Sequence, residues 1–298
     1  MELRQLTYFV AAAEKMNFTE AAKSCFITQS TLSQQIKLME DEMGVPLFNR
    51  IGKRIENLTE AGAILLRYAQ RILQQADEAK MALNELQQLA TGELRIGVTY
   101  ALSHALIKAL ASFTARYPKI HTYMEYGTSA VLEQKLRASQ LDLILTFHIE
   151  SDDDELIKQF LLTSRLMMAV SDQNALAGRK EVSIEELAEQ EMVLPGNEFR
   201  TRRFIDKLFK QKGLKPRIRM ELNDVRSTLE LVVSSNWATI VTEQSLARNW
   251  PHLMGIPIKG EDGKVIIQHA YVIWQKEIYQ KKAARILIEE LIKQAKET

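Results

Sequence analysis

A group of short polar side chains between residues 28 and 37 has the chemistry for hydrogen bonding to nucleic acid. It comprises hydroxyls, two amides and one cation, carried by Thr28, Gln29, Ser30, Thr31, Ser33, Gln34 and Lys37. Glutamine can pair with adenine through two hydrogen bonds, hydroxyls can bond to bases or phosphates, and lysine can neutralise a phosphate. Taken alone, such a group is more typical of the solvated face of an ordinary helix, so its meaning depends on the element that carries it.

The spacing of nearby apolar residues predicts that this element is the second helix of a helix-turn-helix pair. Its buried stripe is expected to be Leu32, Ile36, Met39 and Met43. Thr28 is a suitable N-cap, and Gly44 supplies the C-terminal stop. A shorter helix is predicted to begin at the N-cap Thr19 and to run through Cys25, which is expected to be a small core residue. Because such a second helix reads base edges with its N-terminal residues, the polar group then lies where it could contact bases.

A basic hairpin is predicted directly after this helix. Apolar pairs flank a tip that contains Arg50, Lys53 and Arg54, and the pattern is typical of a β-wing whose cations touch phosphates or the minor groove. A charged hairpin tip is usually just a solvated turn, and its place beside the polar helix favours the functional interpretation. Residues 1–58 contain seven Lys or Arg and seven Asp or Glu, so binding would depend on the placement of charges.

Residues 3–67 resemble the N-terminal module of LysR-type transcriptional regulators. The matching blocks, in the order and spacing of the family, are Phe18-Thr19-Glu20-Ala21-Ala22, Thr28-Gln29-Ser30-Thr31-Leu32-Ser33-Gln34-Gln35-Ile36, Gly44-Val45-Pro46-Leu47-Phe48-Asn49-Arg50 and Leu58-Thr59-Glu60-Ala61-Gly62. Ser30 stands where the family often has Pro, and Cys25 and Met39 stand where it usually has Leu. The resemblance implies a winged helix-turn-helix that recognises a pseudo-palindromic operator with T-rich and A-rich arms.

Residues 59–90 are predicted to form one long helix capped by Thr59. A heptad seam is expected along Leu65, Ala69, Ile72, Ala76, Ala79, Leu83, Leu86 and Ala90. The seam could pack on its own domain, but a helix of about 30 residues spans about 45 Å and is too long for a small winged domain to cover. We therefore expect a linker helix that dimerises the chain. The family resemblance implies the same helix, in a homodimer or homotetramer.

From residue 92 onward, short apolar runs alternate with helical segments, a pattern that predicts a parallel α/β sheet. Strands are expected at Leu94–Thr99, Ile120–Met124, Leu141–Phe147, Leu166–Val170, Met192–Leu194, Ile218–Leu222, Ala238–Thr242 and Ala270–Trp274. This part resembles the family's effector domain, with two α/β lobes like those of periplasmic binding proteins. The expected domains are a winged helix-turn-helix at 1–58, a linker and dimerisation helix at 59–90, and an effector-binding domain at 91–298. Within the last, lobe one is 92–163 with 267–298, and lobe two is 164–266.

Polar residues at the ends of these predicted strands are candidates for binding a small effector, because ligands of α/β sheets lie beyond strand carboxyl ends, beside helix N-termini. The candidates are Thr99, Tyr100, Ser103, Thr128, Ser129, Phe147, His148, Arg200, Thr201 and Arg202. The run 199–206 looks like a stretch in the subgroup that senses cyanate and similar small anions. A hydroxyl and a guanidinium there would suit a carboxylate or another small anion. A basic helix surface explains these arginines equally well.

Composition excludes several other classes. The chain has 298 residues, 46% of them hydrophobic and 26% charged, and 39 cationic side chains against 38 anionic ones. Net charge therefore gives no sign of nucleic-acid binding. One cysteine permits no internal disulfide and no cysteine-based zinc site, and the cytoplasm is the expected compartment. No stretch resembles a signal peptide or a membrane span, and no histidine spacing suggests a metal.

The leading interpretation is a sequence-specific DNA-binding regulator modulated by a small, anionic effector held between two α/β lobes. It is expected to use no cofactor and no catalytic residue. The alternatives are an α/β enzyme or a solute-binding domain, each with an accessory N-terminal helical domain. No G-x-S-x-G, P-loop or G-x-G-x-x-G motif supports the enzyme.

Overall fold

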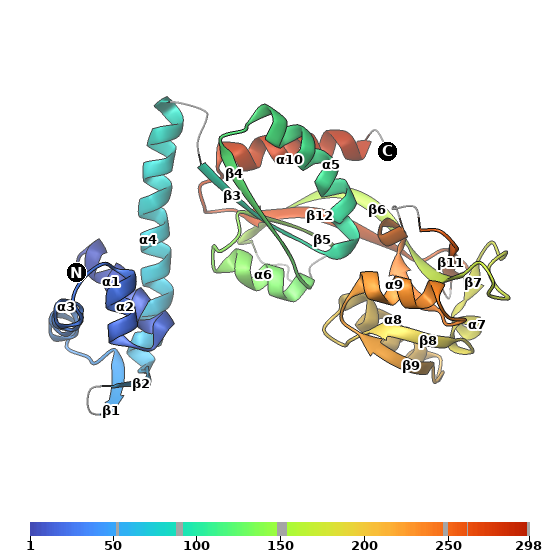
Figure 1. Ribbon diagram of the computed structural model, residues 1–298, viewed down its shortest axis with the longest axis horizontal. Coiled ribbons are helices and arrows are strands. Elements are labelled where there is room, and N and C mark those ends of the chain that lie inside the picture. Colours follow the sequence, from blue (N-terminus) through green and yellow to red (C-terminus); the bar gives the residue numbers. More distant parts are fainter. Residues whose placement is uncertain (52–53, 88–91, 148–153, 247–249, 261, 297–298) are drawn as a thin grey trace. The chain divides into compact units, whose positions relative to one another are not determined.

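The computed structural model describes residues 1–51, 54–87, 92–147, 154–246, 250–260 and 262–296. The chain divides into two units, Met1–Leu89 and Ala90–Thr298, each with its own core (Figure 1). The first unit holds the predicted helix-turn-helix and the second holds the α/β region. Each is described by itself below.

The first unit is a winged helix-turn-helix followed by a long helix. Its elements are α1 (Leu3–Lys15), α2 (Phe18–Ser24), α3 (Gln29–Met43), the antiparallel strands β1 (Phe48–Ile51) and β2 (Arg54–Leu58), and α4 (Glu60–Gln87). The core joins residues from α1, α2 and α3, including the fully buried Phe9, Ala21 and Leu32. Small side chains such as Ala21 let α2 approach its neighbours closely.

The caps of these helices agree with the sequence prediction at α3 but not at α2. The Thr28 Oγ1 accepts a hydrogen bond from the Thr31 N–H at 3.2 Å, and Gly44 ends α3 in the left-handed region. The prediction that Thr19 caps α2 is wrong. The Asn17 side chain accepts from the N–H groups of Thr19 and Glu20 at 2.8 and 3.3 Å, so the N-cap lies two residues earlier than predicted. The first helical residue is Phe18, whose ring is buried. Burying that ring in the first turn fixes the start of the helix.

The first half of α4 packs on its own winged domain. Thr59 caps the helix as predicted, with its Oγ1 accepting from the Gly62 N–H at 2.9 Å. Ala69 is fully buried, and Leu65 and Ile72 pack against the same core. Further along, Ala79 and Leu83 are exposed. The predicted seam therefore splits: its N-terminal part faces the core of its own unit, while these two residues remain uncovered.

The second unit is built on a mixed sheet with the order β4-β3-β5-β12-β6-β11-β7, in which β10 also pairs with β6. The strands are β3 (Gly92–Val98), β4 (Ile120–Tyr126), β5 (Leu143–Phe147), β6 (Leu156–Ser171), β7 (Val182–Ser183), β10 (Thr239–Thr242), β11 (Leu253–Lys259) and β12 (Ile267–Gln275). Strand β3 runs parallel to β4 and β5, as predicted, but β12 runs antiparallel to β5 and β6. The prediction of a parallel sheet is therefore wrong for this part, because β6 carries the chain outward and β12 brings it back alongside.

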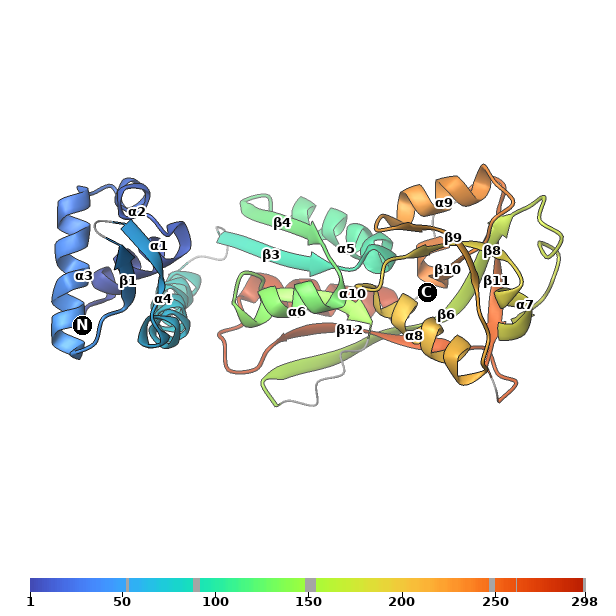
Figure 2. The same cartoon turned by 90° about the horizontal axis from the view of Figure 1, so that it is seen from below.

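Helices cover both faces of this sheet. Helices α5 (Ser103–Arg116) and α10 (Lys282–Lys296) share one core with β3, β5 and β12, and α6 (Ser129–Arg137) covers the opposite face (Figure 1). The outer half of β6 belongs to another core, together with α7 (Ile184–Ala188), α8 (Arg200–Gln211) and the parallel pair β8 (Glu191–Pro195) and β9 (Arg217–Leu222). Helix α9 (Val225–Val233) packs on the other face of β6 (Figure 2). We call the two cores the inner and outer lobes; β6 and β12 connect them.

Candidate nucleic-acid interface and ligand pocket

The N-terminal half of α3 presents the predicted polar group to solvent. Leu32, Ile36 and Met39 are fully buried on one side of the helix. The opposite side carries the exposed residues Gln29, Ser30, Thr31, Gln34 and Lys37, with Ser33 half-buried between them. Thr28, which is also exposed, bonds through its Oγ1 to the Ser30 and Thr31 hydroxyls at 2.9 and 2.8 Å. The cap thus orders the hydroxyls of Ser30 and Thr31 at the helix start. The amides of Gln29 and Gln34 are exposed on the same part of the helix.

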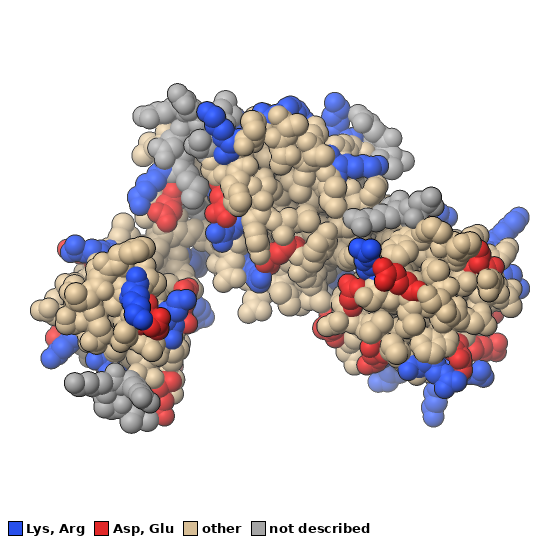
Figure 3. All heavy atoms as spheres, viewed as in Figure 1, with Lys and Arg blue, Asp and Glu red and all other residues tan. Residues whose placement is uncertain are grey.

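Arg50, a predicted phosphate contact, is exposed but pairs with a carboxylate of its own winged domain. Its Nη2 lies 2.6 Å from the Glu40 Oε2, and its guanidinium carbon lies 5.2 Å from the centre of the Phe18 ring. Glu40 also accepts from the Leu47 N–H at 2.8 Å, so it ties the end of α3 to the wing. Arg54 begins β2, and Lys53 lies outside the described residues. Figure 3 shows cationic and anionic side chains interspersed on the visible face of this unit.

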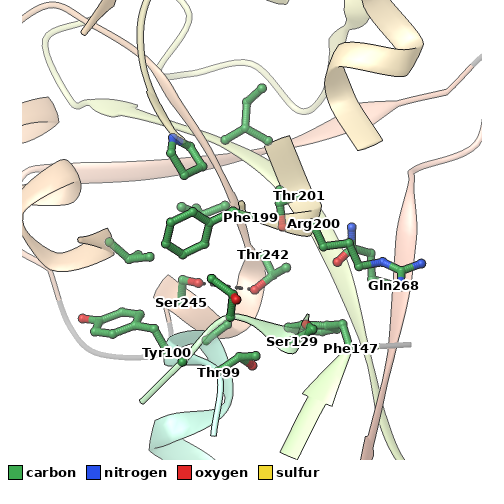
Figure 4. Close-up of a pocket in the computed structure, with 17 residues that line it drawn as sticks. Thr99, Tyr100, Ser129, Phe147, Phe199, Arg200, Thr201, Thr242, Ser245 and Gln268 are labelled. Atoms are coloured by element: carbon green, nitrogen blue, oxygen red, sulfur yellow. Dashed lines mark hydrogen bonds between the residues drawn. The ribbon is translucent and has the colours of Figure 1, made fainter. Parts of the chain in front are cut away.

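A pocket of about 90 Å³ lies between the two lobes of the second unit. Seven of the residues predicted to bind an effector line it, namely Thr99, Tyr100, Thr128, Ser129, Phe147, Arg200 and Thr201 (Figure 4). They come together because the ends of β3 and β5 and the starts of α6 and α8 meet at this point. The strand-end rule therefore locates both walls of the pocket.

The lining of the pocket is mostly apolar, with hydroxyls and one guanidinium among it, and its lining residues include no acidic side chain. Arg200 is the one charged group among them, and the lining also carries hydroxyls, including those of Thr99, Ser129 and Thr242. The Thr99 Oγ1 is buried and makes no hydrogen bond within the described part of the chain. Helix α8 begins at the N-cap Phe199, which supplies no side-chain acceptor to the first N–H groups. Such a helix start attracts negative charge.

Three of the predicted effector residues are not seen in the lining. Ser103 is buried at the start of α5. Arg202 is one step along α8 from Thr201, and this turn of the helix directs it into the outer lobe. There its guanidinium donates to the Asp206 and Glu221 carboxylates at 2.8 and 2.6 Å and to the Pro195 carbonyl at 2.8 Å. Burial opposes the charge of Arg202, but the bonds to Glu221 and Asp206 outweigh it and raise its pKa. His148 lies outside the described residues.

Sequence reasoning missed part of the lining. The missed residues include Phe199, Val225, Ile240, Val241, Thr242, Ser245 and Gln268. Thr242 ends a strand that the sequence predicts, so the strand-end rule could have found it and the nearby Ser245. Gln268 pairs with Ser164 in the β12–β6 ladder, and this long-range pairing leaves no local signal.

Two further observations concern the described residues. None of their helices is long and apolar enough to cross a membrane. No group of three or more His, Cys, Asp or Glu side chains among them is placed to hold a metal ion.

Comparisons with known proteins agree with this geometry. The chain matches the LysR substrate binding domain over residues 87–296 and the bacterial regulatory helix-turn-helix protein, lysR family, over residues 3–63. The HTH-type transcriptional activator CmpR of Synechocystis sp. is 29% identical over 277 residues, which cover 92% of this chain and 89% of CmpR. The HTH-type transcriptional regulator CysB of Burkholderia cenocepacia is 33% identical over 227 residues, 75% of this chain and 72% of CysB.

The fold is similar to that of full-length CbnR, whose structure was solved in complex with its target DNA. The TM-score is 0.68 at 24% identity, and the match covers 99% of this chain and 100% of that one. Because both family descriptions together span nearly the whole sequence, the chain belongs to the LysR family of bacterial helix-turn-helix transcriptional regulators.

Proposed function

We propose that this regulator binds a specific operator through α3 and that a small anion in the pocket between the lobes modulates the binding. The observation that carries the DNA-binding part is the exposed polar face of α3 above a fully buried stripe. Gln29, Ser33 and Gln34 are the residues we assign to base edges. Thr28, Ser30, Thr31 and Lys37, together with Lys53 and Arg54 of the wing, are assigned to phosphates. Arg50 is assigned to shaping the wing through Glu40.

The test is fluorescence anisotropy with an operator selected in vitro by the full-length chain from randomised duplexes. The double variant Gln29→Ala, Ser33→Ala should lose affinity for that operator by about 100-fold and keep its binding to scrambled DNA, because base contacts add specificity to a sequence-independent electrostatic term. Thr7→Ala, an exposed polar change on α1, is the control. Undiminished operator binding by the double variant would refute the assignment of the recognition residues.

The nature of the effector follows from the charge of the pocket. One guanidinium, several hydroxyls and the uncapped start of α8 surround a space without carboxylates among its lining residues. A carboxylate or another small anion would suit these donors, whereas Arg200 would repel a cation. Binding between the lobes would favour one arrangement of the effector domains and so shift the population of DNA-binding states.

We assign residues 1–58 to DNA binding, 59–90 to the linker and dimerisation, and 91–298 to effector binding, with the protein acting in the cytoplasm. The relatives described above are named as transcriptional regulators, which favours a regulator over an enzyme. Turnover of a pocket ligand by the purified chain would contradict a purely regulatory role.

A further inference from the structure

The turn between α2 and α3 has a backbone geometry that disfavours its own side chain. The Phe26 N–H donates to the Lys23 carbonyl at 3.1 Å, and the Ile27 N–H donates to the Ala22 carbonyl at 3.0 Å. These two bonds form a Schellman motif, in which the residue after the C-cap adopts a left-handed conformation. Phe26 accordingly has a φ of 56°. Glycine or asparagine is favoured there, and a bulky residue is strained.

Packing does not explain this residue either. The Phe26 side chain is 95% exposed, whereas the adjacent Ile27 packs against the core of the winged domain. An exposed aromatic ring at a position suited to glycine contributes neither to the turn nor to the core. Departures from local rules of this kind are expected where function requires them.

The place of the ring suggests what it contacts. Phe26 lies two residues before Thr28, which is the N-cap of α3 and the first of the polar residues assigned to DNA. Phenylalanine is among the side chains that make apolar contact with the thymine methyl group. We propose that Phe26 contacts operator DNA directly, packing its ring on the apolar edge of a nucleotide, either a thymine methyl or a deoxyribose. This inference rests on the DNA binding proposed above.

A contact of this kind predicts a distinctive combination of effects. Phe26→Asn removes the ring but suits the left-handed backbone, so the variant should fold and melt at the same or a higher temperature. Its operator affinity should nevertheless fall by about tenfold for each bound winged domain, from the apolar surface left exposed. The slope of log affinity against log salt should stay the same, because the ring neutralises no phosphate.

The experiment compares the full-length wild type with Phe26→Asn and Met16→Asn on the in-vitro-selected operator. Met16 is a matched control: it is also left-handed, with a φ of 49°, and is partly exposed, but it lies at the other end of α2. Anisotropy across a salt series gives affinity and slope, and thermal melting gives stability. Replacing thymine by deoxyuridine in the operator then distinguishes the two sources of apolar contact. This replacement should reduce the affinity difference between the wild type and Phe26→Asn if the ring contacts the methyl group, and should leave that difference unchanged if the ring contacts the deoxyribose.

The outcomes separate this inference from the function on which it rests. Weaker operator binding by Phe26→Asn alone, at unchanged salt slope, supports the contact. Equal binding by all three proteins, or a change in the oligomeric state of Phe26→Asn by sedimentation, overturns it while leaving the regulator intact. If the wild type selects no sequence, the DNA-binding function fails and the contact fails with it.

Discussion

Arg200 provides the one charge among the residues that line the pocket, and this makes it the residue on which anion binding should depend. We expect Arg200→Ala to weaken binding of a small carboxylate by about tenfold or more, since a charge-assisted hydrogen bond is lost from a partly enclosed site. The measurement is isothermal titration of the full-length chain with small carboxylates and inorganic anions. Lys207→Ala, an exposed change two turns along α8, should leave affinity unchanged. Equal losses in both variants would indicate only a general electrostatic effect.

Arg202, two residues after Arg200 on α8, holds this helix to β8 and β9 inside the outer lobe. Its guanidinium joins α8, the Glu221 side chain of β9 and the Pro195 carbonyl, and it is 7% exposed. We expect Arg202→Ala to destabilise the second unit by about 2 kcal/mol. The value lies below that for a fully buried pair because the Asp206 and Glu221 carboxylates remain accessible to water.

Urea unfolding followed by tryptophan fluorescence checks this value. All three tryptophans lie in the second unit, so the signal reports that unit alone. Arg226→Ala removes an exposed pair with Glu230 and should cost less than about 0.5 kcal/mol. Similar losses of unfolding free energy in the two variants would show that the buried Arg202 stabilises the second unit no more than an exposed ion pair does.

At the scale of elements, the start of α9 makes stability depend on pH. Asp224 caps this helix, and Val225 after it lines the pocket. Hydrogen bonds from Ser227 lower the pKa of Asp224 below its usual value. A lowered pKa in the folded state adds stability above the unfolded pKa of about 4, and this contribution disappears as the pH falls through the folded pKa.

Asp224→Asn keeps a capping acceptor but cannot titrate. We expect it to be less stable than the wild type by about 0.5 kcal/mol at pH 7, through loss of the charge at the positive end of the helix. The difference should shrink between pH 5 and pH 3, by urea unfolding at each pH. Glu230→Gln, near the other end of α9, should differ little from wild type at pH 7. A constant Asp224→Asn deficit across this range would contradict the linkage.

How far the sequence predicts each element depends on how local its signals are. The cap, stripe and stop of α3 lie within seventeen consecutive residues, and the structure confirms them. At α2, Asn17 and Thr19 are both good caps, and the choice depends on burying Phe18, a tertiary effect. In the pocket, the ends of predicted strands locate residues on both walls. The position of Gln268 depends on the pairing of β12 with β6, which no local pattern predicts. A run of arginines does not show which one a helix turns inward, so the sequence predicts Arg202 in the pocket although its guanidinium bonds inside the outer lobe.

At the scale of the whole molecule, the exposed part of α4 bears on how two copies meet an operator. Ile64, Tyr68 and Leu83 are 45%, 58% and 64% exposed along this helix, and the exposed Ala79 leaves room for a close approach. We expect such a surface to pack on the corresponding surface of a second copy, in the manner of a two-stranded coiled coil. Dimerisation would present two recognition helices to two half-sites about one turn of DNA apart.

Leu83→Glu should therefore act on DNA binding without touching the winged domain. A buried carboxylate at the seam opposes association, so the variant should sediment as a smaller species than the wild type at micromolar concentration. Once the copies separate, the second half-site no longer benefits from a local concentration in the millimolar range, and affinity for the full operator should fall by about 100-fold or more. Affinity for a single half-site should stay the same, because α3 and its cap are unchanged. Gln70→Glu adds the same charge on α4 about 140° round the helix from Leu83, on the side away from Ile64 and Tyr68, and should alter neither quantity. If Leu83→Glu remains associated and still binds the full operator tightly, the copies meet through another surface and α4 serves only as a connector.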